Sequence, residues 1–205
     1  PTDGPSLVRN GGFETTAAGR LVDWQPAPQG GVAELGAGRD GSIALAGALP
    51  DQPGWVGASQ TITLNQTNPA PVMVRGWSRA ENVSGTPGSD YALYVDVIHT
   101  DGTPLWGQTA HYRCGTHDWE AREVMIQPAK PTRSLTAHCL LRHRTGRVWF
   151  DDVTAHELRA APGSVLFQGA TVTPQPVPAN PTPAKRRTYR TVEWIALAER
   201  QSPQT

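Results

Sequence analysis

Three pairs of acidic or histidine side chains lie close enough in the sequence to suggest acid and base catalysis. They are Glu120 with Glu123, Asp151 with Asp152, and His117 with Asp118. General acid–base chemistry needs two such groups aimed at one bond. Glu120 and Glu123 are three residues apart on a predicted strand, where side chains alternate between faces, so they should point to opposite sides. Surface carboxylates are therefore the favoured interpretation, and we predict that the protein is not an enzyme.

Other motifs that could indicate a chemical function lie in a sequence context that does not support that function. Residues 36–41, GAGRDG, match the glycine pattern of dinucleotide-binding folds. That mechanism needs a helix directly after the glycines, because the helix N-terminus holds the pyrophosphate. The residues that follow, 42–47, alternate as a strand, so the match is attributed to chance. The six histidines show no metal-ligand spacing.

Aromatic residues indicate binding more than reaction. The chain contains seven Trp and four Tyr. Some must form a core, but flat rings also stack on the C–H faces of sugars while polar side chains bond the hydroxyl groups. Trp55 is the first candidate because it follows the turn-like residues 51–54. Further candidates lie on predicted central strands, with core packing as the alternative for each: Tyr94, His99, Gln108 and Tyr112.

Composition narrows the class of protein. Lys plus Arg and Asp plus Glu both number 18, so the formal net charge is zero and a nucleic-acid partner is not expected. The 21 Gly and 19 Pro residues favour turns and strands over long helices. No run of about 18 apolar residues exists for a membrane span. Cys114 and Cys139 allow one bridge, although small buried thiols are the simpler interpretation.

Apolar blocks alternate with turn clusters at the spacing of a β-sandwich or barrel. The blocks are residues 42–47, 57–64, 72–83, 91–100, 105–114, 119–127, 134–144 and 147–158. Within the fourth block, Tyr91, Leu93, Val95 and Val97 share one side, which predicts a strand with one buried face.

Six segments resemble carbohydrate-binding modules of families 4, 9, 16 and 22 in their order and spacing. They are LVRNGGFE at 7–14, GSIAL at 41–45, WVGASQ at 55–60, VMVRGW at 72–77, GTHDW at 115–119 and VWFDDV at 148–153. The resemblance covers residues 7–158. It implies an all-β fold, a two-sheet antiparallel β-sandwich of the galactose-binding-like jelly-roll type.

The same resemblance implies a structural calcium ion that joins the first and last strands. By it, Glu14 and Asp151 are the side-chain ligands, backbone oxygens near Asp40 and Ser42 complete the site, and Asp152 is a further contributor. Carboxylate and carbonyl oxygens are the hard ligands that Ca²⁺ prefers. The alternative is that Glu14 and Asp151 only accept hydrogen bonds at the ends of the sandwich.

Together these features predict a non-catalytic, extracellular (secreted) module that binds a polysaccharide or oligosaccharide through residues 1–160. Residues 161–205 form a Pro-rich linker and C-terminal arm, with five prolines between 174 and 183. The alternative is a structural subunit of an extracellular filament or other assembly. In that case residues 163–200 would add a strand to a neighbouring copy, because an open sheet edge offers unpaired backbone groups.

Overall fold

The computed structural model describes residues 2–3, 5–51, 54–159, 165–167 and 170–172. The chain divides into two units, Pro1–Val172 and Thr173–Thr205. The second unit, and with it most of the predicted Pro-rich arm, lies outside the described residues. The strands are β1 (Thr2–Asp3), β2 (Thr16–Ala17), β3 (Arg20–Leu21), β4 (Gln25–Pro26), β5 (Val32–Leu35), β6 (Ile43–Leu49), β7 (Trp55–Thr63), β8 (Val72–Val83), β9 (Tyr91–His99), β10 (Pro104–His111), β11 (Gly115–Ile126), β12 (Thr132–Arg142), β13 (Gly146–Arg159), β14 (Val165–Phe167) and β15 (Ala170–Val172).

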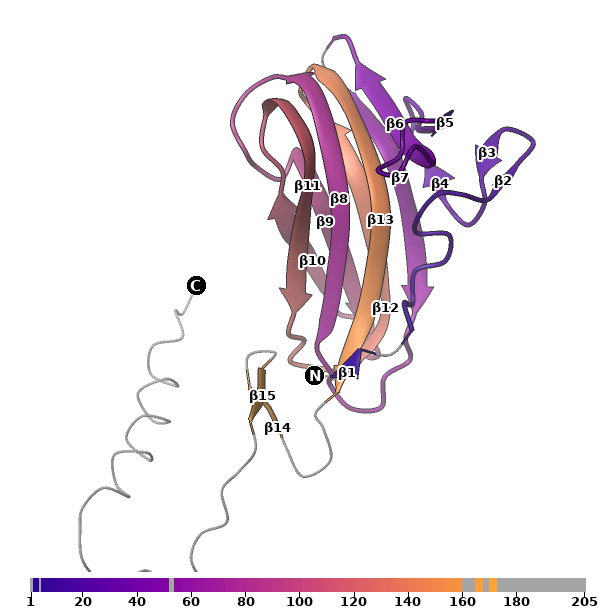
Figure 1. Ribbon diagram of the computed structural model, residues 1–205. Coiled ribbons are helices and arrows are strands. Elements are labelled where there is room, and N and C mark those ends of the chain that lie inside the picture. Colours follow the sequence, from indigo (N-terminus) through magenta and orange to yellow (C-terminus); the bar gives the residue numbers. More distant parts are fainter. Residues whose placement is uncertain (1, 4, 52–53, 160–164, 168–169, 173–205) are drawn as a thin grey trace, which may run out of the picture. The chain divides into compact units, whose positions relative to one another are not determined.

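Two antiparallel sheets face each other and form a sandwich (Figure 1). One sheet has the order β11-β8-β13-β6-β5, with β1 added to β13, and the other has the order β10-β9-β12-β7-β4. The described residues contain strands and turns but no helix, and so none that is long and apolar enough to cross a membrane. The predicted all-β jelly-roll sandwich is confirmed.

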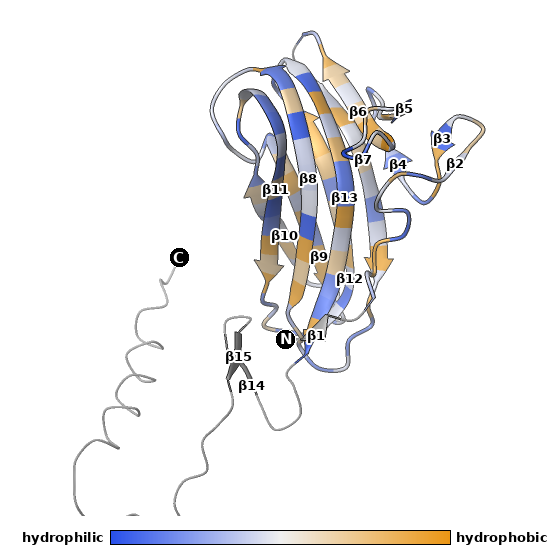
Figure 2. Cartoon of the chain, in the orientation of Figure 1, coloured by the Kyte–Doolittle hydropathy of each residue, from blue (hydrophilic) through white to orange (hydrophobic). Residues whose placement is uncertain are grey.

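Each of the eight apolar blocks overlaps one of the long strands β6 to β13, and β8 has the predicted bounds. Alternation explains why these segments pair. On β9, Tyr91, Leu93, Val95 and Val97 are all buried between the sheets, as predicted, and Figure 2 shows the same apolar and polar alternation on β8 and β13. Because each Å² of buried apolar surface contributes about 25 cal/mol, this core between the sheets is the main source of stability. A smaller cluster of Ala37, Ala44, Ala46 and Trp149 is separate from it.

The amino-terminal segment folds over the sandwich through a close backbone approach at Gly11. A Cβ atom at this position would lie 2.0 Å from the carbonyl oxygen of Val153, so no other residue fits. Phe13 is then fully buried and packs on Trp24, with ring centroids 5.0 Å apart. This arrangement places Glu14 next to Ile43, the first residue of β6.

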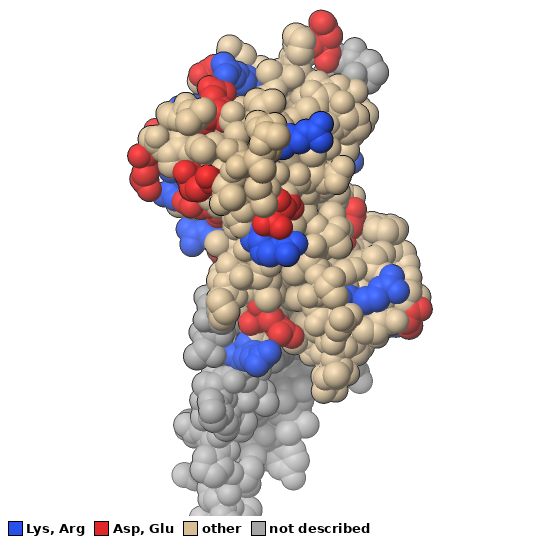
Figure 3. Space-filling view, turned by 90° about the vertical axis from the view of Figure 1, so that its right-hand side faces the viewer, with Lys and Arg blue, Asp and Glu red and all other residues tan. Residues whose placement is uncertain are grey.

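The structure also shows the state of the two cysteines and the distribution of charge on one face. Cys114 and Cys139 are free thiols, and Cys139 is buried in the core, where burial raises its pKa. Basic and acidic side chains are interspersed on the face seen in Figure 3, without a large patch of one sign.

Candidate functional site

An open cleft of about 610 Å³ lies on the outer face of the five-stranded sheet. Its floor is built from β7, β9 and β12, which are neighbours in that sheet. The register places Tyr94 opposite His138 and Arg142 opposite Trp55, so residues distant in sequence meet on one surface. The lining residues are Pro28, Gln29, Gly54, Trp55, Tyr94, Asp96, His138, Leu140, Arg142 and His143.

Aromatic rings form one wall of this cleft. The His138 ring centroid lies 6.4 Å from that of Trp55 and 5.8 Å from that of Tyr94. The Trp55 backbone N–H donates to Oε1 of Gln29 at 2.9 Å, which holds the start of β7 against the preceding loop. The cleft therefore presents partly exposed ring faces on a rigid sheet.

Polar groups stand beside these rings. Nε2 of His138 lies 3.6 Å from Oδ2 of Asp96, and the Arg142 guanidinium lies 5.2 Å from the Tyr94 ring centroid. Nε of Arg142 donates to Oδ1 of Asp90 at 3.1 Å. Burial lowers the pKa of His138, Asp96 acts in the opposite direction, and the charge of Arg142 lowers it further. The imidazole is therefore neutral near pH 7 and can both donate and accept a hydrogen bond.

The structure brings together two of the five predicted binding residues, Trp55 and Tyr94. Tyr112 does not line the cleft, because it is fully buried between Tyr91 and Phe150 at centroid distances of 5.2 and 5.9 Å. Its placement in a binding surface was wrong.

His99 and Gln108 are also separated from the cleft. His99 is only 6% exposed, and it shares the phase of the core residues of β9 rather than that of Tyr94. Gln108 lies opposite Val95, whose side chain is in the core, and its amide donates to the carbonyl of Trp106 at 3.1 Å. A register shift between Leu105 and Gln108 sets the side toward which Gln108 points, and the residue type alone does not reveal this side.

Sequence reasoning missed three polar residues of the cleft, Asp96, His138 and Arg142. The sequence alone could have identified Asp96, because a residue two positions after Tyr94 on a strand must lie on the same face. His138 and Arg142 lie on β12, more than forty residues later, and only the pairing of β12 with β9 and β7 reveals their position.

The predicted calcium ligands lie around the loop before β6. Asp151 is 2% exposed, and its carboxylate accepts backbone N–H groups of Arg39 at 2.9 Å and Asp152 at 2.7 Å. Burial raises the pKa of Asp151, these hydrogen bonds lower it, and the charges of Asp152 and Glu14 raise it. Glu14 accepts the N–H of Ile43 at 2.9 Å. Glu14 and Asp151 thus hold the two ends of one loop, which is the hydrogen-bonding role that the sequence left open.

The other predicted ligands have partners of their own. Asp152 is exposed, has a positive φ of 48°, and is ion-paired with Arg39. The carbonyl of Ser42 accepts the N–H of Gly38 at 3.0 Å, and Asp40 is exposed. In the described part of the chain, no group of three or more His, Cys, Asp or Glu side chains is arranged to hold a metal ion. Glu14 and Asp151 supply two hard oxygen donors that lie close enough for the charge of Glu14 to raise the pKa of Asp151, and this pair fits calcium by its chemistry.

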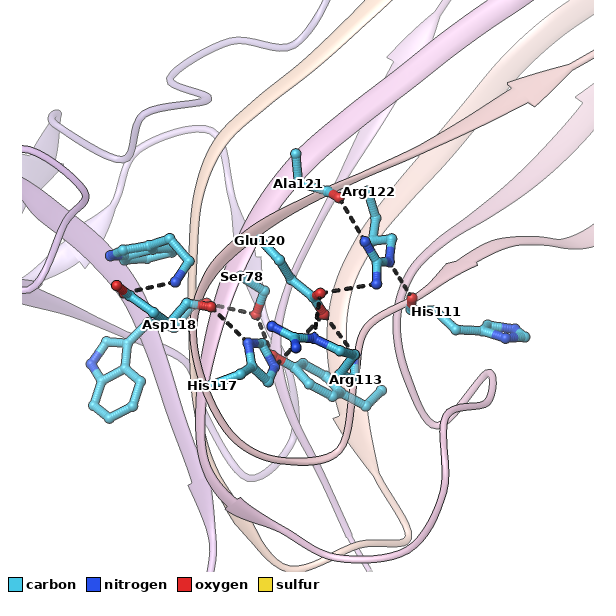
Figure 4. A network of polar contacts seen from close by, with 11 residues as sticks. Ser78, His111, Arg113, His117, Asp118, Glu120, Ala121 and Arg122 are labelled. Carbon is cyan, nitrogen blue, oxygen red and sulfur yellow. Dashed lines mark hydrogen bonds and ion pairs between the residues drawn. The ribbon is translucent and has the colours of Figure 1, made fainter.

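A second polar cluster surrounds Glu120 at the other sheet (Figure 4). Its carboxylate is 10% exposed and lies 2.9 Å from Nε of Arg113 and 2.9 Å from Nη2 of Arg122. His117 is 3.8 Å from it. The cluster continues from His117 to the Tyr91 hydroxyl at 3.5 Å. We call these residues, with Ser78, the Glu120 network.

Each polar group of the Glu120 network is engaged by another. The Ser78 hydroxyl is 2.6 Å from that of Tyr91 and donates to the carbonyl of Trp149 at 2.7 Å. Glu123 is exposed and takes no part, as its opposite phase on β11 predicted. The network therefore ties β8, β9, β11 and β13 together and leaves no free acid–base pair.

No family model matches the sequence, and no curated protein matches it. Solved structures do match. The CBM22-1 xylan-binding domain from Paenibacillus barcinonensis has 15% identity and a TM-score of 0.56, with 78% of this chain and 99% of that domain covered. TmCBM61, solved in complex with β-1,4-galactotriose, has 16% identity and a TM-score of 0.52, with 75% and 99% covered. The described domain has the fold of carbohydrate-binding modules, as its sequence resemblance implied.

The fold also occurs inside larger proteins. The enzymatically active domain of tailspike protein 4 from bacteriophage CBA120 matches with 10% identity and a TM-score of 0.55. That match covers 73% of this chain but only 21% of the tailspike domain. The chain thus spans about a fifth of that enzyme, whose activity is not assigned to it.

Proposed function

We propose that the protein is a non-catalytic carbohydrate-binding module that holds a polysaccharide or oligosaccharide in the cleft of the five-stranded sheet. The observation that carries this proposal is the meeting of Trp55 and Tyr94 with Asp96, His138 and Arg142 on one open surface. Rings supply flat apolar faces for sugar C–H groups, and the polar side chains can bond hydroxyl groups. The binding of xylan and galactotriose by modules of this fold supports the ligand class.

The cleft favours binding over hydrolysis. Glycoside hydrolysis commonly uses two carboxyl groups that flank the scissile bond. The described lining contains one carboxylate, Asp96, and it is already close to His138 and to the backbone of Gly107. An open cleft also leaves much of its ligand in water, so affinity should be modest. Because polysaccharides of this kind are found outside cells, the proposal includes an extracellular location.

The direct test is retention on polysaccharide gels. Stacking on Trp55 would bury roughly 60 Å² of apolar surface, worth about 1.5 kcal/mol, so Trp55→Ala should weaken binding about tenfold. Affinity electrophoresis in gels with xylan or β-1,4-galactan measures this. Glu123→Ala is the control, since Glu123 is an exposed residue of the other sheet and lies outside both the cleft and the β5 edge. Equal mobility of wild type in gels with and without polysaccharide would reject the proposal.

We further propose that calcium binds between Glu14 and Asp151 with backbone oxygens of residues 40–42. The support is chemical: hard oxygen donors from the first and last parts of the domain's sequence meet at one loop, and neighbouring negative charges destabilise the ionised form of the buried Asp151. An ion bound only by the folded state would stabilise it by mass action. Calcium should raise the melting temperature of chelator-treated protein, and Glu14→Gln should abolish the increase. An unchanged melting temperature would leave only the loop-holding role.

Self-assembly is the second candidate function, because one sheet edge is open. β5 ends the six-stranded sheet, and its Val32 and Leu35 are 59% and 82% exposed. Such an edge can accept a strand from another copy. The predicted donor, residues 163–200, lies largely outside the described residues. Light scattering of the full chain and of a Val32→Lys, Leu35→Lys double variant tests this idea. A wild-type monomer at all concentrations would contradict it.

A further inference from the structure

Trp106 is an exposed tryptophan that the cleft described above does not include. It is 59% exposed, and in the described part of the chain only Val32 and Leu35 are other large apolar residues with comparable exposure. Trp106 lies on β10, the edge strand next to β9. A single exposed apolar residue is common on protein surfaces, so what makes Trp106 a candidate is its flat ring and its place next to the cleft.

A β-bulge directs Trp106 toward the cleft face. Leu105 lies opposite Val97 and Gln108 opposite Val95, so Trp106 and Gly107 together lie opposite Asp96. Leu105 is packed against the core. Because side chains alternate, Trp106 takes the opposite, outer face, which Asp96 and Tyr94 also occupy.

The bulge is attached to two residues of the cleft. The backbone N–H of Gly107 donates to Oδ1 of Asp96 at 3.0 Å. Gly107 has a φ of 71°, and a Cβ atom there would lie 3.4 Å from the Tyr94 hydroxyl oxygen. The positive φ favours glycine, whereas the distance to Tyr94 is an ordinary contact. Trp106 is thus held in a defined place beside the cleft.

The distance between Trp55 and Trp106 follows from the register. Trp55 lies opposite Arg142, and Asp96 lies opposite Thr136, which is six residues from Arg142 on β12. Three strand spacings separate β7 from β10. With about 3.4 Å per residue and about 4.8 Å per strand, the two tryptophans are roughly 25 Å apart along a diagonal of the sheet. A ligand that touches both must contain several sugar units.

By the same register, the diagonal from Trp55 to Trp106 crosses β12 near Leu140 and β9 at Tyr94, and threonine side chains lie beside it. Thr61 and Thr136 are paired across β7 and β12 on the outer face, and their hydroxyl oxygens are 2.9 Å apart. Thr109 lies opposite Tyr94 on the same face. A sugar chain that spans both tryptophans therefore crosses the cleft and meets ring faces, with hydroxyl groups beside it as hydrogen-bonding partners.

We propose that Trp106 is a second stacking platform, which makes the module select long carbohydrate chains over short ones. The inference rests on the proposed carbohydrate-binding function. One sugar unit would stack on Trp55, and a unit several positions along the same chain would stack on Trp106, with Tyr94 between them. A short oligosaccharide is too short to touch both tryptophans, and we expect it to bind at Trp55, where His138 and Arg142 also lie.

The test is a length series. Calorimetry with xylo-oligosaccharides and β-1,4-galacto-oligosaccharides of increasing length, from disaccharides to chains longer than the span, compares wild type with Trp106→Ala and Trp55→Ala. Trp106→Ala should lose about tenfold in affinity for the longest chains and nothing for the shortest. Trp55→Ala should weaken both. Trp106→Tyr, which keeps a flat ring, should retain most of the affinity, and the melting temperature should stay unchanged because the side chain is exposed.

The outcomes separate this inference from the proposed function. If wild type binds long chains and Trp106→Ala binds them with the same affinity, the role of Trp106 is overturned. The proposed carbohydrate binding would still stand. Equal losses of Trp106→Ala for short and long chains would also contradict a remote platform. If wild type binds neither series, the proposed function and this inference both fail for these sugars.

Discussion

The cleft and the Glu120 network contain similar residue types but use them in opposite ways. Both combine tyrosine, histidine, arginine and a carboxylate. In the network, Glu120 is surrounded by Arg113, Arg122 and His117, and its groups are paired within the chain. In the cleft, the Tyr94 ring is partly exposed and its hydroxyl has no hydrogen bond to a described residue. Polar groups satisfied internally stabilise a fold, whereas half-exposed groups with spare capacity can serve an external ligand.

The strongest way to sharpen this comparison is to remove Glu120. Glu120→Ala leaves His117 and two arginines without their anion, so the free energy of unfolding should fall by about 2 kcal/mol. Thermal denaturation should show a decrease of about 4–8 °C in melting temperature. Binding of polysaccharide by the folded protein should not change.

Glu123→Ala is the matched control for that variant. Glu123 lies on the same strand three residues later and is exposed, so its loss should alter neither stability nor binding. A destabilisation equal to that of Glu120→Ala would show that charge on β11, rather than the network, determines the effect.

Two tyrosines allow a second contrast of smaller size. The Tyr112 hydroxyl is buried without a hydrogen-bond partner, so Tyr112→Phe should raise stability by up to about 1 kcal/mol and leave binding unchanged. Tyr94→Phe should instead weaken sugar binding severalfold and leave the melting temperature unchanged. Denaturant unfolding and calorimetry measure the two effects. If Tyr112→Phe binds sugar more weakly than wild type, Tyr112 contributes to binding, and the contrast between the two tyrosines is wrong.

The smallest expected effect is a pH dependence confined to the cleft. Burial lowers the pKa of His138, so the folded protein binds this proton less well than the unfolded chain, whose histidine pKa is about 6.5. The contribution of His138 to the free energy of unfolding is therefore fully present above pH 6.5. It is lost as the pH falls from 6.5 through the lowered pKa of the folded protein. A ligand that buries the ring further should favour its neutral form, so affinity should fall about two- to threefold at acid pH.

His138→Gln tests that effect, because glutamine keeps hydrogen-bonding capacity without titrating. Its affinity should vary less between pH 7 and pH 5 than that of wild type. An identical pH profile in the variant would assign the dependence to another group.

The sequence predicted the fold well because strand formation follows a local pattern. All eight blocks became strands, since apolar residues at period two need only one buried face to be recognised. The amino-terminal segment with Gly11 and Phe13 was also recognisable, because a backbone contact that excludes Cβ leaves a fixed residue pattern. The sides on which Asp151 and Asp152 lie were harder to predict. A register shift between Asp151 and Thr154 breaks the alternation, so Val153 enters the core while Asp152 is exposed.

The site was predicted only where local information was sufficient. Trp55 and Tyr94, chosen by residue type and position, line the cleft, and their role in binding stays a prediction; Tyr112 has the same residue type as Tyr94 but lies in the core. His99 has the phase of Val97, so alternation along β9 already predicted its burial, whereas the side of Gln108 depends on the bulge in β10.

What the sequence determined by itself is therefore the class of fold, the positions of its strands and the abundance of aromatic rings. Only the tertiary structure decided which rings face water, that His138 and Arg142 join Trp55 and Tyr94, and that Trp106 lies on the same face. The physical reason is that alternation is a property of one strand, whereas a binding surface depends on the register between strands that are far apart in the chain.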